Sequence, residues 1–151
     1  MIYRKATMED INELVRLRME FLNEVQDSDR QNDEQLAKKT FEYLKINMQN
    51  DSFISWLALD DNKIVGTSGI YFYTVPPSYK NISGKTAYIM NMYTIPGYRS
   101  KGIANELFNS VVKEARDRGC GKITLNATDM GRPLYLKNGF VDSHGDMVYN
   151  I

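Results

Sequence analysis

Cysteine and histidine are almost absent from this sequence, which has one of each, Cys120 and His144, in 151 residues. A single cysteine excludes an internal disulfide and a multi-cysteine zinc site. A single histidine leaves little room for a histidine-rich metal site or for a mechanism that uses two histidines. We therefore expect no metal, and any acid–base chemistry must depend on tyrosine, carboxylates, lysine, backbone groups or water. Ten tyrosines are available.

An excess of charge of one sign is also lacking, because 19 lysines and arginines balance 19 aspartates and glutamates. This balance disfavours a nucleic-acid or membrane-surface partner, since both usually need a basic excess. No run of about 18 apolar residues is present, and residues 1–5 lack the apolar core of a secretion signal. Because 42% of the residues are hydrophobic and 25% are charged, we expect one globular domain over residues 1–151, located in the cytoplasm.

The apolar pattern alternates between the helical and the strand period and shows no internal repeat. We expect the first helix to begin at Thr7, whose hydroxyl can cap a free backbone N–H. The order of elements predicts a mixed α/β (α+β) sheet domain. The expected helices cover residues 7–25, 33–48, 102–118 and 132–138, and the expected strands cover residues 2–5, 53–59, 63–75, 85–94, 122–127, 140–142 and 147–151.

The segment from Met92 to Ala104 is the most informative for chemistry, because a strand ends there, a short basic turn follows and a helix begins. The first amides of a helix lack internal partners and bind phosphate well. Gly102 allows a ligand to approach the backbone closely. Arg99 and Lys101 add positive charge. The pattern is consistent with a pyrophosphate site, and equally with an ordinary turn that carries solvated basic residues.

Two motifs carry a family resemblance. The segment Arg99-Ser100-Lys101-Gly102-Ile103-Ala104 resembles the R/Q-x-x-G-x-G/A signature of the GCN5-related N-acetyltransferases, the GNAT family. About 30 residues later, Leu134-Tyr135-Leu136-Lys137-Asn138-Gly139-Phe140 resembles the family's L-Y-x-K-x-G-F signature. The resemblance implies a mostly antiparallel twisted sheet of about six to seven strands with flanking helices. It also implies that the sheet splays open between its fourth and fifth strands, here residues 85–94 and 122–127.

The resemblance further implies which residues bind the co-substrate, acetyl-CoA. Residues Arg99, Ser100, Lys101, Gly102, Ile103 and Ala104 would hold its pyrophosphate through backbone N–H groups. The strand end at Met92, Tyr93 and Thr94 would lie along its acyl and pantetheine portion. Thr128 occupies the position where the family often has an asparagine, so Asn126 is expected to take over that contact. Tyr135 matches the family's general acid, which protonates the departing thiolate.

The implied function is the direct transfer of an acetyl group to the primary amine of a small molecule or peptide. Another acyl-CoA, a protein amine and a non-catalytic coenzyme A-binding regulator are alternatives, and a homodimer stays open. The sequence does not single out the group that takes the proton of the amine. Candidates are the carboxylates Glu20, Glu24 and Asp129, and water ordered by Asn91, Tyr93 or Asn126.

Overall fold

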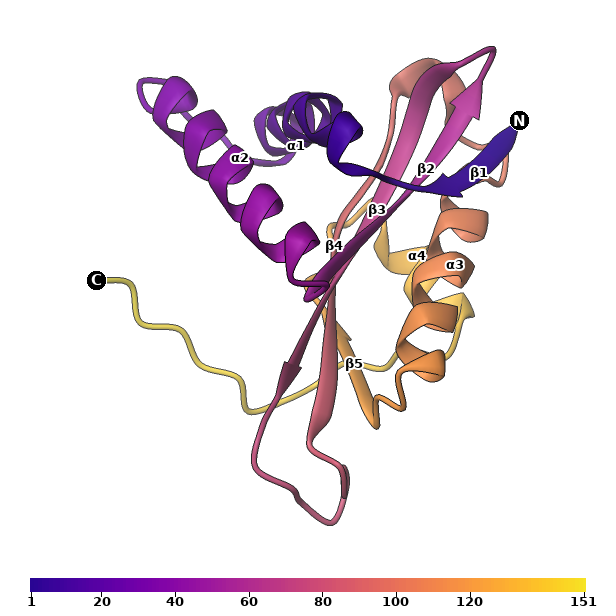
Figure 1. Cartoon of the computed structure of the whole chain (residues 1–151). Helices are drawn as coiled ribbons and strands as arrows, with labels where there is room; N and C mark the ends of the chain where they lie inside the picture. The colour runs from indigo at the N-terminus through magenta and orange to yellow at the C-terminus, as the bar shows by residue number, and fades with distance from the viewer.

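A single five-stranded sheet organises the chain, and the computed structural model describes all 151 residues (Figure 1). The strands follow one another across the sheet in chain order, β1-β2-β3-β4-β5. The first four pair antiparallel, and β4 and β5 pair parallel. The strands are β1 (Ile2–Lys5), β2 (Phe53–Asp60), β3 (Lys63–Thr74), β4 (Lys85–Thr94) and β5 (Lys122–Leu125).

Helices cover both faces of this sheet (Figure 1). Helices α1 and α2 lie on one face, and α3 and α4 lie on the other. None of the helices combines the length and the apolar composition that crossing a membrane requires. The helices are α1 (Ile11–Val25), α2 (Asp33–Gln49), α3 (Ile103–Asp117) and α4 (Arg132–Lys137), and two short 3-10 turns are η1 (Met8–Asp10) and η2 (Pro96–Tyr98).

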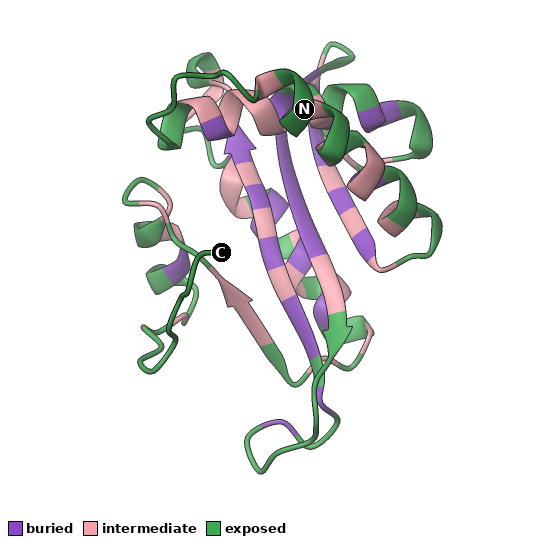
Figure 2. Cartoon of the chain, turned by 90° about the vertical axis from the view of Figure 1, so that its left-hand side faces the viewer, coloured by how far each residue is buried: buried purple, intermediate pink, exposed green.

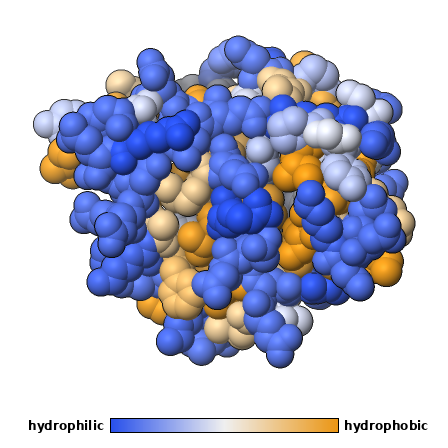
Figure 3. All heavy atoms as spheres, turned by 90° about the horizontal axis from the view of Figure 1, so that it is seen from above, coloured by the Kyte–Doolittle hydropathy of each residue, from blue (hydrophilic) through white to orange (hydrophobic).

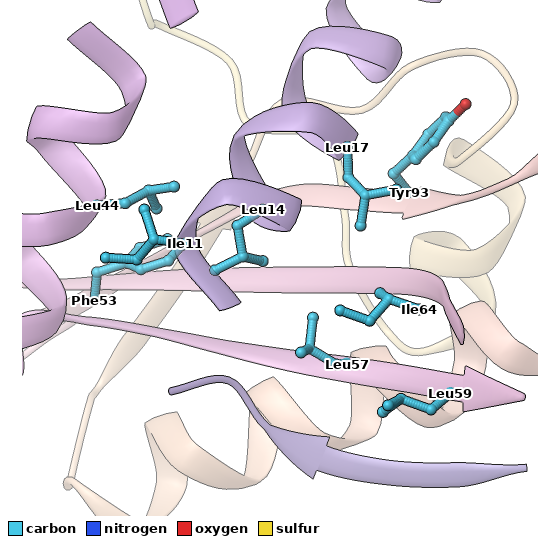
Figure 4. Packing of buried hydrophobic residues seen from close by; sticks show 9 residues of the cluster. All are labelled: Ile11, Leu14, Leu17, Leu44, Phe53, Leu57, Leu59, Ile64 and Tyr93. Carbon is cyan, nitrogen blue, oxygen red and sulfur yellow. The ribbon is translucent and has the colours of Figure 1, made fainter. Parts of the chain in front are cut away.

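The hydrophobic core consists of separate layers on the two faces of the sheet. Strand residues alternate between the layers, so the central strands are buried on both sides (Figure 2). On one face, α1 and α2 pack onto β2, β3 and β4 through nine buried residues (Figure 4). On the other face, α3 and α4 pack through Phe108, Val111 and Tyr135. Seen from above, the surface is mostly hydrophilic, with hydrophobic patches between the polar side chains (Figure 3).

The start of the first helix has Thr7 as its N-cap, as expected. Thr7 and Asp10 form a capping box, and the Thr7 hydroxyl also donates to the Asp10 carboxylate at 3.2 Å. The same carboxylate accepts the Thr7 amide at 2.7 Å and two hydrogen bonds from the Arg4 guanidinium. Asp10 is thus the reciprocal partner of Thr7 in this capping box, and Arg4 adds a charged hydrogen-bond donor to it.

The two C-terminal strands predicted at residues 140–142 and 147–151 are wrong, and the sheet has five strands rather than six to seven. Phe140 packs its ring against Phe108 and Tyr135 instead of entering a strand. From Val141 the chain runs away from the body of the protein with almost all side chains exposed (Figure 1). An alternating pattern forms a strand only when a neighbouring strand supplies hydrogen bonds, and this tail has no such neighbour.

Candidate functional site

The sheet opens between β4 and β5, as the family resemblance implies. The two strands pair only from Thr86 to Ile89 on the β4 side. Two residues further on, Asn91 adopts a left-handed backbone with φ of 56°, at a bulge that shifts the register between β3 and β4. A bulge bends its strand, which explains the divergence. The resulting cleft has a volume of about 1060 Å³, large enough for a cofactor-sized ligand.

One end of the cleft is formed by the loop before α3. Ser100 and Gly102 are both left-handed, with φ of 61° and 81°. None of the five amides from Ser100 to Ala104 donates to an acceptor in the chain, and the first amides of the helix that do are those of Asn105 and Glu106, both to the carbonyl of Gly102. Free amides at a helix N-terminus, where the helix dipole is positive, form an anion-binding site.

The basic side chains of this loop do not both face the cleft. The Arg99 guanidinium donates through Nε to the Thr94 carbonyl at 2.8 Å and through Nη2 to the Glu24 carboxylate at 2.7 Å. Lys101 lies outside the cleft wall and donates to the carbonyl of Gly97 at 3.2 Å. An anion at this loop would therefore meet its backbone amides, and a role of Lys101 toward a ligand stays a prediction.

The C-terminal end of β4 forms part of the cleft wall, which includes Met92, Tyr93 and Thr94. The Tyr93 ring is largely buried between Phe21 and the Arg99 guanidinium. The Thr94 hydroxyl is buried and has no hydrogen-bond partner in the chain. A buried hydroxyl without a partner is costly, so this position fits a ligand that supplies a polar group.

Tyr135 lies on the opposite wall, on α4. Its ring packs against Phe108 and Phe140 with centroid distances of 5.8 and 6.1 Å. A Cβ on Gly131 would stand only 3.1 Å from the ring and 3.4 Å from the hydroxyl oxygen, so glycine leaves the phenol its space. Burial raises the pKa of Tyr135 to about 12. The phenol therefore keeps its proton at neutral pH and can serve as a proton donor there.

The segment between β5 and α4 completes this wall. Asn126 lines the cleft and donates from its amide to the Tyr88 hydroxyl at 3.1 Å. The Thr128 hydroxyl accepts the Gly131 amide at 3.1 Å, just before α4 begins. Thr128 thus shapes the start of the helix, and Asn126 remains the amide side chain on this side of the cleft.

The carboxylates considered as proton acceptors have different positions. Glu20 is not part of the cleft wall and pairs with Arg16. Glu24 is in the wall, and the hydrogen bond from Arg99 holds its pKa below the usual range. Asp129 is in the wall and exposed to solvent. Glu24 is therefore a weak base, since a carboxylate with a lowered pKa gives little driving force for proton abstraction.

Asn105 and Arg18 are among the cleft residues that were not identified from the sequence as parts of the site. Asn105 follows the loop motif by one residue and lines the cleft from the first turn of α3. Arg18 lies on α1, half-buried in the cleft wall, and donates to the Asn91 side chain at 2.7 Å. A signal for Arg18 was available, because it is a charged residue within the apolar stripe of its helix.

Comparison with known proteins agrees with this geometry. The model of the acetyltransferase (GNAT) family matches residues 11–140. Thialysine N-epsilon-acetyltransferase from Bos taurus is 30% identical over 64 residues, which cover 42% of this chain and 35% of that protein. Glucosamine 6-phosphate N-acetyltransferase from Trypanosoma brucei brucei is 26% identical over 52% of this chain and 51% of that protein. This chain thus spans about a third to a half of the length of these two relatives.

A solved structure covers the whole chain. The structure of a predicted acetyltransferase with acetyl-CoA, from Clostridium acetobutylicum, is 36% identical and has a TM-score of 0.88. The superposition includes 99% of this chain and 95% of that chain. The family match spans most of the sequence, and the fold, the splayed strands and both motifs agree with it. The chain belongs to the acetyltransferase (GNAT) family.

Proposed function

We propose that this protein is an N-acetyltransferase that moves an acetyl group from acetyl-CoA to the primary amine of a small molecule. The observation that carries the proposal is the cleft between β4 and β5, with free amides from Ser100 to Ala104 at one end and Tyr135 on the facing wall. Acetyl-CoA is present in the related Clostridium acetobutylicum structure.

The cleft residues fit the chemical groups of this co-substrate. The five free amides from Ser100 to Ala104 match the oxygens of a pyrophosphate, and no Cβ obstructs the approach at Gly102. The unpaired Thr94 hydroxyl suits a polar group of the pantetheine arm. Beyond Ile89, β4 has no strand partner on its β5 side, so its main chain is available to an extended ligand.

Acetyl transfer to an amine forms a carbon–nitrogen bond and breaks a carbon–sulfur bond. The amine loses one proton, and the thiolate sulfur gains one. Tyr135 would donate its hydroxyl proton to that sulfur. A free phenol and a free thiol, with pKa values of about 10 and 8.5, would exchange a proton near balance. Burial raises the pKa of Tyr135 to about 12, so proton transfer from this phenol to a free thiolate is less favourable than between the free groups.

Support for a small-molecule acceptor comes from the relatives. Their names describe acetylation of thialysine and of glucosamine 6-phosphate, which are both small amines. In this chain, the cleft carries polar and charged side chains on α1 and on the segment after β5, where an amine can approach. A peptide or protein amine and a regulator without activity are the alternatives that the experiment below separates.

A thiol-release assay with acetyl-CoA and a panel of small amines and peptides tests the proposal, together with calorimetric titration of acetyl-CoA. We expect acetyl-CoA to bind and at least one small amine to accelerate thiol release. Acceleration by peptides alone would replace the small-molecule acceptor with a peptide or protein acceptor. Binding of acetyl-CoA without release by any amine would favour a regulator. Failure to bind acetyl-CoA would overturn the proposal entirely.

A further inference from the structure

The formal charges of the cleft wall sum to zero, but not all of them are paired. Four side chains of its wall carry formal charge: Arg18, Glu24, Arg99 and Asp129. Glu24 and Arg99 neutralise each other at 2.7 Å, and Asp129 is exposed to solvent. Arg18 is half-buried and forms no ion pair with any carboxylate of the chain, unlike five of the other seven arginines. The cleft therefore contains one cation without a counter-ion.

The guanidinium of Arg18 is nevertheless held in place. Its Nη1 donates to Oδ1 of Asn91 at 2.7 Å, and this is its one hydrogen bond within the chain. Asn91 lies at the β4 bulge, one residue before Met92 in the cleft wall. Phe21 and Tyr88 also line this part of the cleft. Four of the five N–H donors of Arg18 remain free in the cleft wall.

A half-buried guanidinium without a counter-ion is unfavourable, because partial burial removes water that would solvate its charge. Burial accordingly lowers the pKa of Arg18. The planar fork of an arginine matches the paired oxygens of a carboxylate or phosphate. An anionic ligand group would both satisfy the free donors and supply the missing charge.

We propose that Arg18 is a specificity-determining residue that binds an anionic oxygen group, a carboxylate or a phosphate, on the amine acceptor. Asn91 acts as a positioning residue, since it fixes the orientation of the fork. The inference rests on the proposed function for the identity of the ligand as an acceptor. The central claim of the inference is that an anionic amine binds in preference to a neutral analogue, and this preference is measurable without turnover.

The test uses matched amines that differ only in the anionic group: L-lysine with cadaverine, and phosphoethanolamine with ethanolamine. Their binding to the protein saturated with coenzyme A is measured by calorimetry for wild type, Arg18→Met, Arg18→Lys and the control Arg16→Met. Arg16 lies on the same helix but pairs with Glu13 and Glu20 outside the cleft. Circular dichroism and thermal unfolding establish that each variant is folded.

We expect at least one anionic amine to bind wild type about tenfold or more tightly than its neutral analogue, in line with a charge-assisted hydrogen bond. Arg18→Met should abolish this preference, Arg18→Lys should retain part of it, and Arg16→Met should keep it. Equal binding within both pairs, or a preference that survives Arg18→Met, overturns the inference. The thiol-release assay distinguishes failure of the proposed function from failure of the Arg18 inference. Anion-dependent binding without turnover would contradict the proposed function but would still support an anion-binding site at Arg18.

Discussion

The guanidinium of Arg99 joins the loop before α3 to helix α1, because its Nη2 lies 2.7 Å from Oε2 of Glu24, 75 residues away in the sequence. Its Nε also donates to the Thr94 carbonyl at 2.8 Å. One side chain thus connects the end of β4, the anion-binding loop and α1. The pair also removes Glu24 from consideration as a strong base, since Arg99 holds the pKa of that carboxyl down.

Replacement of Glu24 by glutamine tests this role. Because the lowered pKa keeps Glu24 charged from pH 6 to 9, its protonation cannot shape activity in that range. We expect Glu24→Gln to keep the shape of the kcat profile from pH 6 to 9, and to raise the KM for acetyl-CoA a few-fold because Arg99 loses its partner. Thiol-release rates against pH measure both, with Glu20→Gln as the control outside the cleft. Loss of one limb of the profile would identify Glu24 as the base.

Tyr135→Phe tests the general acid. The substitution keeps the ring that packs against Phe108 and Phe140 and removes only the proton donor. A positioned acid typically contributes about 10²- to 10⁴-fold, so we expect kcat to fall about 100-fold or more while the affinity for acetyl-CoA changes less than about threefold. Steady-state kinetics and calorimetry measure the two effects. A wild-type turnover rate in the variant would remove Tyr135 from the mechanism.

Ser100 tests the backbone of the anion-binding loop. It is exposed and adopts φ of 61°, a conformation that costs a residue with a Cβ about 1–2 kcal/mol. Ser100→Gly removes this strain, and after the larger chain entropy of unfolded glycine we expect a net stabilisation of roughly 0.5–1 kcal/mol. Ser100→Ala keeps the Cβ and should change stability little. Urea unfolding of both variants measures their free energies of unfolding. Equal values for Ser100→Gly and Ser100→Ala would show that the backbone strain at Ser100 is negligible.

Gly69 on β3 tests the packing of the Phe53 ring, from the neighbouring strand β2, against the sheet. A Cβ there would lie 2.6 and 2.8 Å from ring atoms of the fully buried Phe53. Overpacking of this kind costs about 1–3 kcal/mol, so Gly69→Ala should lower the free energy of unfolding by that amount. The control is Gly97→Ala, since a Cβ at that position would have no neighbour within 4 Å and the φ of Gly97 is not positive. Urea unfolding measures both variants, and similar unfolding midpoints for Gly69→Ala and Gly97→Ala would contradict the packing argument.

Asp10 predicts a pH dependence of stability. Hydrogen bonds from Arg4 and Thr7 lower its pKa from 3.8 to about 2. The charged form is therefore favoured by the folded state, so the stabilisation is fully present above about pH 4 and is lost as the pH falls through 2. Asp10→Asn should cost roughly 1–2 kcal/mol at pH 7 and progressively less between pH 4 and 2. Urea unfolding of the wild type and of Asp10→Asn across this pH range measures how far their free energies of unfolding converge. The exposed Asp117→Asn is the control. A difference that does not change with pH would refute the assignment.

Much of the fold was predictable because it depends on residues close together in the sequence. The apolar periods predicted every helix and the first five strands, with ends that differ by a few residues. Gly119 and Gly139 end α3 and α4 in left-handed conformations, as a helix C-terminus favours. The strands expected at residues 140–142 and 147–151 failed because a strand also needs a partner in space, which an alternating pattern does not supply.

The sequence by itself determined the order of the elements, the backbone of the anion-binding loop and the position of Tyr135 within its motif, because each depends on hydrogen bonds and dihedral preferences over a few residues. The tertiary structure decided the rest of the site. Only packing brings Glu24 to Arg99, turns Lys101 out of the cleft and places Arg18 beside Asn91, 73 residues away. The energies of such long-range contacts depend on how helices lie against the sheet, and no local pattern in the chain encodes that arrangement.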